Sequence, residues 1–212
     1  LLNELSIYDE QYLKHHTNAG YLIGPNGKYV RDSAAQKPLI HDLSDGVVKT
    51  YDDPTLKDPA LDGEYEVDGQ LATTCFSVLK EHAKEFPPER VEEITTIPAK
   101  TLRRIAREFG EAAQIGSTIR IEGEELPLRP AALDWDRGPQ GHRHAWHHTW
   151  ALMLVNIVVG AIQVPGGELG TAAAGNYPYR FAPFQGADGL MERQSLQEGE
   201  HSGFCPGRDP VP

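Results

Sequence analysis

The chain has few cysteines, fewer basic than acidic residues, and no apolar run long enough to cross a membrane. Its two cysteines, Cys75 and Cys205, are far apart and form no Cys-x-x-Cys pair. The chain alone therefore cannot build an iron–sulfur cluster or a cysteine-rich zinc site, because both need several thiolate ligands. With 20 Lys and Arg against 31 Asp and Glu, its formal charge is −11. This charge argues against a nucleic-acid partner, because such binding needs a basic surface.

The longest apolar stretch, residues 151–164, is interrupted by Asn156, Gly160 and Gln163. It is shorter than the roughly 20 apolar residues of a membrane span, so we predict a buried helix and no direct membrane span. No signal peptide is visible. The chain lacks an initiating Met, begins with helical character but no capping residue, and ends without a closing element. We therefore expect an interior piece of a longer protein.

Apolar spacing and turn residues predict an α/β protein. Proline is pre-organised for a first helical turn, so Pro88 and Pro98 are expected to open two helices. The apolar stripe within residues 102–109 is expected to pack on a sheet. Residues 21–65 are rich in Gly, Pro and Asp and are expected to form an irregular excursion with short strand-like pieces. The expected helices cover residues 2–13, 71–83, 87–94, 98–109 and 151–164, and the expected strands cover residues 21–23, 28–30, 46–49, 116–121, 126–128 and 131–135.

A glycine loop follows the last expected strand. Residues 135–144 contain Gly138 and Gly141 and lead towards the apolar helix. A loop at the carboxyl end of a strand is where open α/β sheets hold phosphates and cofactors, because glycine lets the backbone approach and a helix amino terminus favours anions. Arg137 and Arg143 flank the loop. Each is either a two-donor partner for a bound phosphate or pterin, or a surface salt-bridge residue.

Four of the nine histidines lie within residues 142–148. His144 and His148 have the spacing of metal ligands on one helix face, but Ala145 stands where zinc hydrolases place their general base, and no third ligand is evident. The histidines are therefore structural, contacts to a cofactor or substrate, or metal ligands.

Two further patterns have a favoured structural interpretation. For Gly166 and Gly167 we favour a tight turn over a phosphate loop. The three tryptophans at 135, 146 and 150 are expected in the core.

Several segments occur in the same order as in one enzyme family. They are residues 8–19, 91–109, 137–142 and 154–167. Over about residues 1–185 the chain resembles the catalytic subunit of molybdopterin oxidoreductases of the dimethyl-sulfoxide-reductase type. The resemblance implies a large enzyme of which this chain is an interior fragment.

The resemblance also implies a domain organisation. Residues 1–170 would be the later part of a Rossmann-like α/β domain that binds the pterin cofactor, with residues 21–65 as the irregular excursion. Residues 171–212 would be an irregular segment that leads into the next domain.

The family's chemistry is a two-electron oxidation or reduction of a small-molecule substrate by oxo or hydride transfer at molybdenum or tungsten. The implied cofactor is that metal held by two pyranopterin guanine dinucleotides. The protein ligand to the metal lies upstream in the family, and a 4Fe–4S cluster is expected only upstream or in a partner subunit. The implied partners are the remainder of the catalytic subunit and an iron–sulfur electron-transfer subunit. An extracytoplasmic, periplasmic location follows by the same analogy.

Residue by residue, the resemblance implies that Arg137, Gly138, Gln140 and His142 contact the cofactor. Many members have Met before the Gly and Gln three residues after it, where this chain has Arg137 and Gly141. Candidate catalytic residues are His142 and Arg180, the latter because some members place an arginine after the Pro-Gly-Gly turn in the active site. Two alternatives remain at this point, namely a stand-alone α/β nucleotide-binding module without catalysis and a metal hydrolase built on the histidines.

Overall fold

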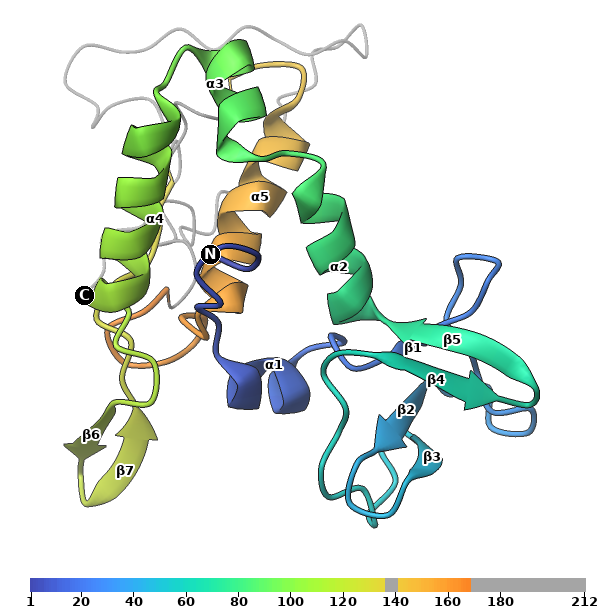
Figure 1. The fold of residues 1–212 in the computed structure, drawn as a ribbon. Coiled ribbons are helices and arrows are strands. Elements are labelled where there is room, and N and C mark those ends of the chain that lie inside the picture. The colour runs from blue at the N-terminus through green and yellow to red at the C-terminus, as the bar shows by residue number, and fades with distance from the viewer. Residues whose placement is uncertain (136–140, 169–212) are drawn as a thin grey trace, which may run out of the picture. The chain divides into compact units, whose positions relative to one another are not determined.

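The structure is a computed structural model that describes residues 1–135 and 141–168 (Figure 1). Helices and strands both contribute to these residues, which confirms the predicted α/β mixture. The sheets within them are small and antiparallel, so the Rossmann-like domain and its boundary at residue 170 stay predictions. The helices are α1 (Glu10–His16), α2 (Cys75–Lys84), α3 (Pro88–Thr95), α4 (Ala99–Ala112) and α5 (Ala145–Val158), and the strands are β1 (Leu22–Ile23), β2 (Leu39–Asp42), β3 (Val47–Thr50), β4 (Glu64–Val67), β5 (Gln70–Thr74), β6 (Thr118–Ile121) and β7 (Glu124–Pro127).

Residues 21–74 form a β module with regular strand pairing. β5 lies between β1 and β4, and β2 pairs with β3 as a hairpin. Leu22, Leu39 and Ala72 form its small core. Asp68 and Gly69 both have positive φ, which is the two-residue turn that joins twisted antiparallel strands such as β4 and β5. The region expected to be irregular therefore contains more strand than its turn-rich composition indicated.

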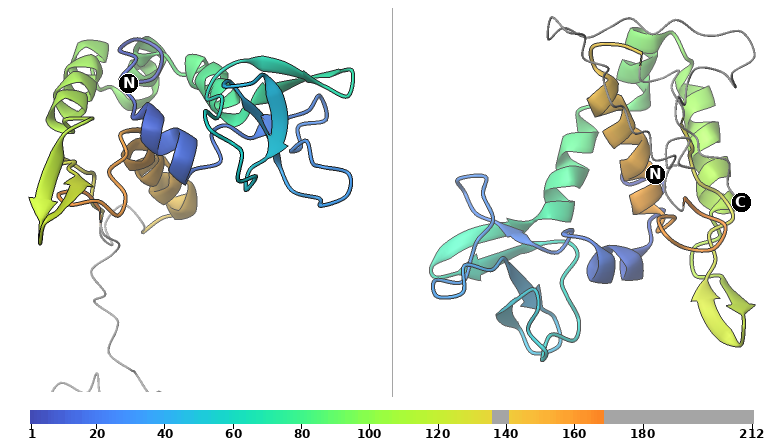
Figure 2. Two further views of the ribbon diagram at one scale, coloured as in Figure 1. Left: turned by 90° about the horizontal axis from the view of Figure 1, so that it is seen from below. Right: turned by 180° about the vertical axis from the view of Figure 1, so that it is seen from behind.

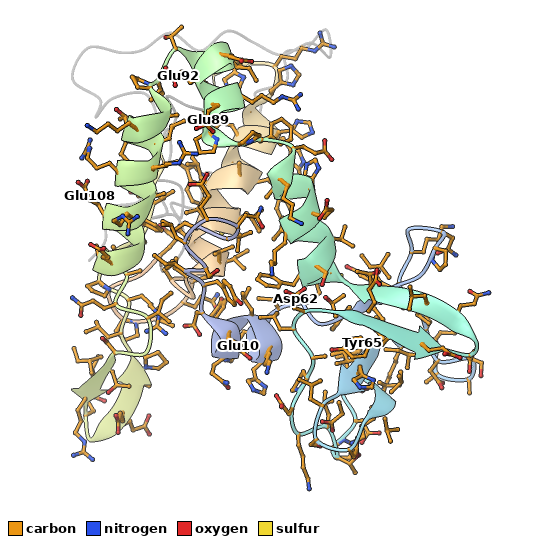
Figure 3. All side chains as sticks on the ribbon, in the orientation of Figure 1. Glu10, Asp62, Tyr65, Glu89, Glu92 and Glu108 are labelled. Atoms are coloured by element: carbon orange, nitrogen blue, oxygen red, sulfur yellow. The ribbon has the colours of Figure 1, made fainter. Side chains whose placement is uncertain are left out.

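Capping residues set where the first two helices begin. Asp9 accepts the N–H of Tyr12 at 3.0 Å, so α1 begins at Glu10 and the expected start near residue 2 is wrong. Thr74 caps α2 in the same way by accepting from Ser77. Residues 71–74, expected in that helix, belong to β5 instead, which pairs with β4 and with β1. Asp62 connects the β module to α2 through Lys80, whose Nζ lies 2.5 Å from its carboxylate (Figure 3).

α3 and α4 begin at the predicted prolines. Pro88 is the first residue of α3, and Pro98 precedes α4. The N–H of Ala99 donates to Glu92 of α3 at 2.9 Å, so a carboxylate stabilises the amino terminus of α4 (Glu92 is labelled in Figure 3). The hairpin β6–β7 follows α4 (Figure 2). It turns at Glu122 and Gly123, both with positive φ, between the strands predicted at residues 116–121 and 126–128.

The apolar stripe of α4 does not pack on a sheet, contrary to the prediction. Leu102, Ile105, Ala106 and Phe109 line a groove of about 790 Å³ together with residues of α2, α3, α5 and the amino-terminal segment. Ile105 remains 51% exposed. The stripe faces other helices because the described strands pair among themselves in the β module and in the β6–β7 hairpin.

α5 both begins and ends earlier than the predicted 151–164. Its carboxyl end is closed by Gly160, which has φ +71°. The N–H of Gly160 donates to Ile157 and that of Ala161 donates to Asn156, which is the paired arrangement of a glycine-terminated helix. The residue that ends the helix is therefore Gly160. It lies five residues before Pro165, the residue that directly follows the predicted helix. No helix among the described residues is long and apolar enough to span a membrane.

Candidate functional site

Residues 129–135 lead into the glycine loop and are named here the strap. The strap was predicted to contain a strand over residues 131–135, and this prediction is wrong. Its backbone pairs with a side chain and not with a neighbouring strand. The N–H of Leu133 donates to Asn156 Oδ1 at 2.7 Å, and Asn156 Nδ2 donates to the carbonyl of Leu133 at 2.7 Å. Asn156 belongs to α5 and is fully buried. The strap before the loop is thus tied to the helix after it.

A buried ion pair holds the beginning of the strap. The Arg129 guanidinium contacts the carboxylate of Asp9, and both residues are about 95% buried. Arg129 Nε donates to the carbonyl of Val159 at 3.1 Å, and the N–H of Asp9 donates to Val158 at 2.8 Å. The strap, α1 and the carboxyl end of α5 therefore meet at one charged pair. Such burial is tolerated because each charge is paired and hydrogen-bonded.

Three glycines permit this close packing. A side chain at Gly160 would place its Cβ 2.5 Å from Asp9 Oδ2, and one at Gly166 would place it 2.9 Å from the carbonyl oxygen of Arg129. A side chain at Gly167 would place its Cβ even closer to the carbonyl oxygen of Ala161. Gly166 and Gly167 thus form a tight turn against the strap, as the favoured interpretation predicted.

The described end of the glycine loop carries exposed imidazoles. The N–H of His144 donates to His142 Nδ1 at 3.0 Å, so neutral His142 carries its proton on Nε2. That nitrogen lies 3.5 Å from His148 Nδ1. No side chain of the described residues caps α5, so its first turn presents N–H groups that favour an anionic acceptor. Among the residues that the structure describes, no three His, Cys, Asp or Glu side chains converge as metal ligands.

The charge of this region differs from that of the chain as a whole. No Asp or Glu occurs between Arg137 and Gly167, although the chain carries a formal charge of −11. The same stretch holds Arg137, Arg143 and the four clustered histidines. From Arg137 onward, the glycine loop and α5 therefore offer hydrogen-bond donors without competing carboxylates, whereas Asp134 and Asp136 precede this stretch.

The tryptophans of α5 are not in the core, so that expectation is wrong for both. Trp146 is 68% exposed and Trp150 is 52% exposed, and their rings meet edge to face at 5.8 Å. They lie four residues apart on one side of α5, whereas Asn156 and Val158 near the carboxyl end of the helix are buried. No described element covers the tryptophan side.

Of the residues to which the family resemblance assigned a cofactor or catalytic role, only His142 lies in the described part of the chain. Arg137, Gly138, Gln140 and Arg180 lie outside it, so their roles stay predictions. Sequence reasoning did not identify Asp9, Arg129 or Asn156 as parts of the site. The sequence contained one signal for Asn156. This polar residue lies within the helix that was expected to be buried, and a buried amide requires hydrogen-bond partners.

Comparison with known proteins gives relatives of one kind. A sulfite dehydrogenase chain from Allochromatium vinosum is 30% identical over 186 residues, which cover 76% of this chain and 19% of that protein. The chain belongs to the molybdopterin oxidoreductase family. The alpha chain of chlorate reductase from Ideonella dechloratans is 31% identical over 47% of the chain and 13% of its own length. The alpha chain of dimethylsulfide dehydrogenase from Rhodovulum sulfidophilum is 29% identical over 51% of this chain and 14% of its own length.

This molybdopterin oxidoreductase chain spans about a fifth or less of the length of these curated relatives. No family model matches it. The resemblance found from short motifs is nevertheless confirmed, because the relatives are catalytic subunits of molybdopterin enzymes.

Proposed function

We propose that residues 134–144 form part of the pterin-cofactor site in the catalytic subunit of a molybdenum or tungsten oxidoreductase. The observation that carries this proposal is the pairing of Asn156 with Leu133, which closes the loop between the strap and α5. A loop at a helix amino terminus that carries no carboxylate from Arg137 onward suits a ligand rich in acceptors and negative charge. The donor chemistry of the described residues fits a pterin nucleotide.

The residues would have distinct tasks. The backbone N–H of His144 already occupies Nδ1 of His142. The Nε2 proton of His142, which lies 3.5 Å from His148 Nδ1, would turn to the ligand as a donor. Arg137 and Gln140 supply further donors, and Gly138 lets the loop backbone approach the ligand. When bound, the group supplies two-electron oxo or hydride exchange with a small-molecule substrate. The chain's own residues bind and orient it.

The finer features of the enzyme rest on the family alone. We propose the bis(pyranopterin guanine dinucleotide) form of the cofactor, an iron–sulfur cluster elsewhere in the enzyme, a partner subunit for electron transfer, and an extracytoplasmic location. The names of the relatives mention sulfite, dimethylsulfide and chlorate. They favour a small sulfur compound or oxyanion as substrate.

Arg180 is proposed to contact this substrate. Arg180→Lys should lower turnover at unchanged metal content, because an ammonium lacks the planar two-donor fork.

The test compares two substitutions in the intact enzyme. Gly138→Val should lower metal and guanine nucleotide per protein, because a branched side chain prevents close approach of the backbone. His147→Ala serves as the control, since His147 is an exposed residue of the same region. Equal cofactor content in the two variants would remove the glycine loop from the cofactor site.

A further inference from the structure

Asn156 makes an unusual contact for a residue in an apolar helix. Its side chain is fully buried and uses both its donor and its acceptor on the backbone of a single residue, Leu133. An extended residue normally makes this pair of hydrogen bonds with a neighbouring strand. The amide of Asn156 takes the place of that strand.

The chemistry of the contact restricts which side chain can make it. A neutral amide has one acceptor and one donor group at the required separation. Aspartate keeps the acceptor for the N–H of Leu133 but sets a negative oxygen against its carbonyl. Leucine has a similar volume and leaves both backbone groups unpaired, which is costly in a buried position.

The position of the contact relates it to the loop. Leu133 lies four residues before Arg137, and Asn156 lies on the helix whose first residue is Ala145. The pair therefore holds the strap, which leads into the glycine loop, against the helix that follows the loop. Asn156 does not belong to the loop and acts only through Leu133.

We infer that Asn156 is a positioning residue that holds the glycine loop in the register needed for cofactor binding. This inference rests on the proposed function of the loop. It assigns to Asn156 a role in cofactor affinity in addition to its contribution to packing.

The experiment uses the intact enzyme and measures metal and guanine nucleotide per protein. Asn156→Leu should lower cofactor content on the order of tenfold, a typical effect of losing a group that orients a ligand-binding residue. Asn156→Asp should be depleted at about pH 8 and regain cofactor towards about pH 5. Burial favours its neutral form, which can donate to the carbonyl of Leu133 as the amide does.

Leu22→Ala is the control, because it removes a buried side chain from the core of the β module, away from the loop. When its thermal stability equals that of Asn156→Leu, the Leu22→Ala variant should keep its cofactor. Equal loss in Leu22→Ala and Asn156→Leu, or no pH-dependent recovery in Asn156→Asp, would overturn the positioning role. Full cofactor content in Asn156→Leu while Gly138→Val is depleted would overturn this inference alone. Full content in both would overturn the proposed function of the loop.

Discussion

The β module and the loop region, residues 129–168, satisfy their buried polar groups in different ways. In the β module, buried Asp42 accepts from Lys49 Nζ at 2.7 Å and from the N–H groups of Ser44 and Lys57, all within 15 residues along the chain. In the loop region, Arg129 pairs with Asp9, 120 residues away. The buried carboxylate of the β module is satisfied by local contacts, whereas the buried ion pair of the loop region depends on the chain folding back on itself.

The two regions also differ in their apolar surfaces. The core of the β module is enclosed by its own strands. α5 contributes Leu154, Val155 and Val158 to the apolar groove and exposes both of its tryptophans. The candidate site therefore lies in the region whose packing is less complete within the described residues. We expect the loop region to be the first to lose structure.

The largest effect is expected from Arg129→Met. This change leaves the Asp9 carboxylate buried without its partner and should lower the free energy of unfolding by about 3–5 kcal/mol. Denaturation followed by tryptophan fluorescence measures it, because all three tryptophans lie in the loop region. Adding Asp9→Leu should restore part of the loss. An unaltered midpoint for Arg129→Met would mean that the pair contributes nothing to the region.

Gly160→Ala should have the next largest effect. The φ of Gly160 is +71°, and the added Cβ would lie 2.5 Å from Asp9 Oδ2. The backbone strain alone is worth roughly 1–3 kcal/mol. Gly46→Ala is a matched control, with φ +73° and no atom within 4 Å of the added Cβ. Equal destabilisation of the two variants would show that contact with Asp9 is unimportant.

Asp42 should make the stability of the β module depend on pH. Burial raises the pKa of its carboxyl, but hydrogen bonds from Lys49, Ser44 and Lys57 outweigh burial and hold the pKa well below its usual range. The stabilisation is therefore complete above the unfolded value of about 3.9 and is lost as the pH falls towards the folded value. Hydrogen exchange of β-module amides during acid titration should detect this loss, and Asp42→Asn should remove it. The same acid dependence in Asp42→Asn would assign the effect to other groups.

The smallest effect on stability is expected from Trp146→Gln combined with Trp150→Gln. Both side chains are exposed, so the unfolding midpoint should change little. Exposed apolar surface promotes association, so sedimentation velocity should detect less self-association than in the unmodified chain. A large fall in the midpoint would show that the tryptophans are packed.

Local sequence signals predicted part of this fold. Pro88 and Pro98 marked the starts of α3 and α4, and Glu122 with Gly123 marked the β6–β7 turn, because φ preference is a property of one or two residues. Residues 71–74 were assigned to a helix, since their role as a strand depends on pairing with β4 and β1. The glycine loop was identified from its motif. The residues that hold it in place were not, because Asp9, Arg129 and Asn156 have no special spacing in the sequence.

The sequence by itself determined the family, the turns, the proline-led helices and the excess of acidic charge, because each is written in residue identity or in short-range spacing. Only the tertiary structure decided that residues 129–135 pair with an asparagine and not with a strand, and that one arginine links the strap to α1 and α5. Hydrogen bonds and ion pairs depend on distance in space. Partners 23 and 120 residues apart meet only after the chain has folded.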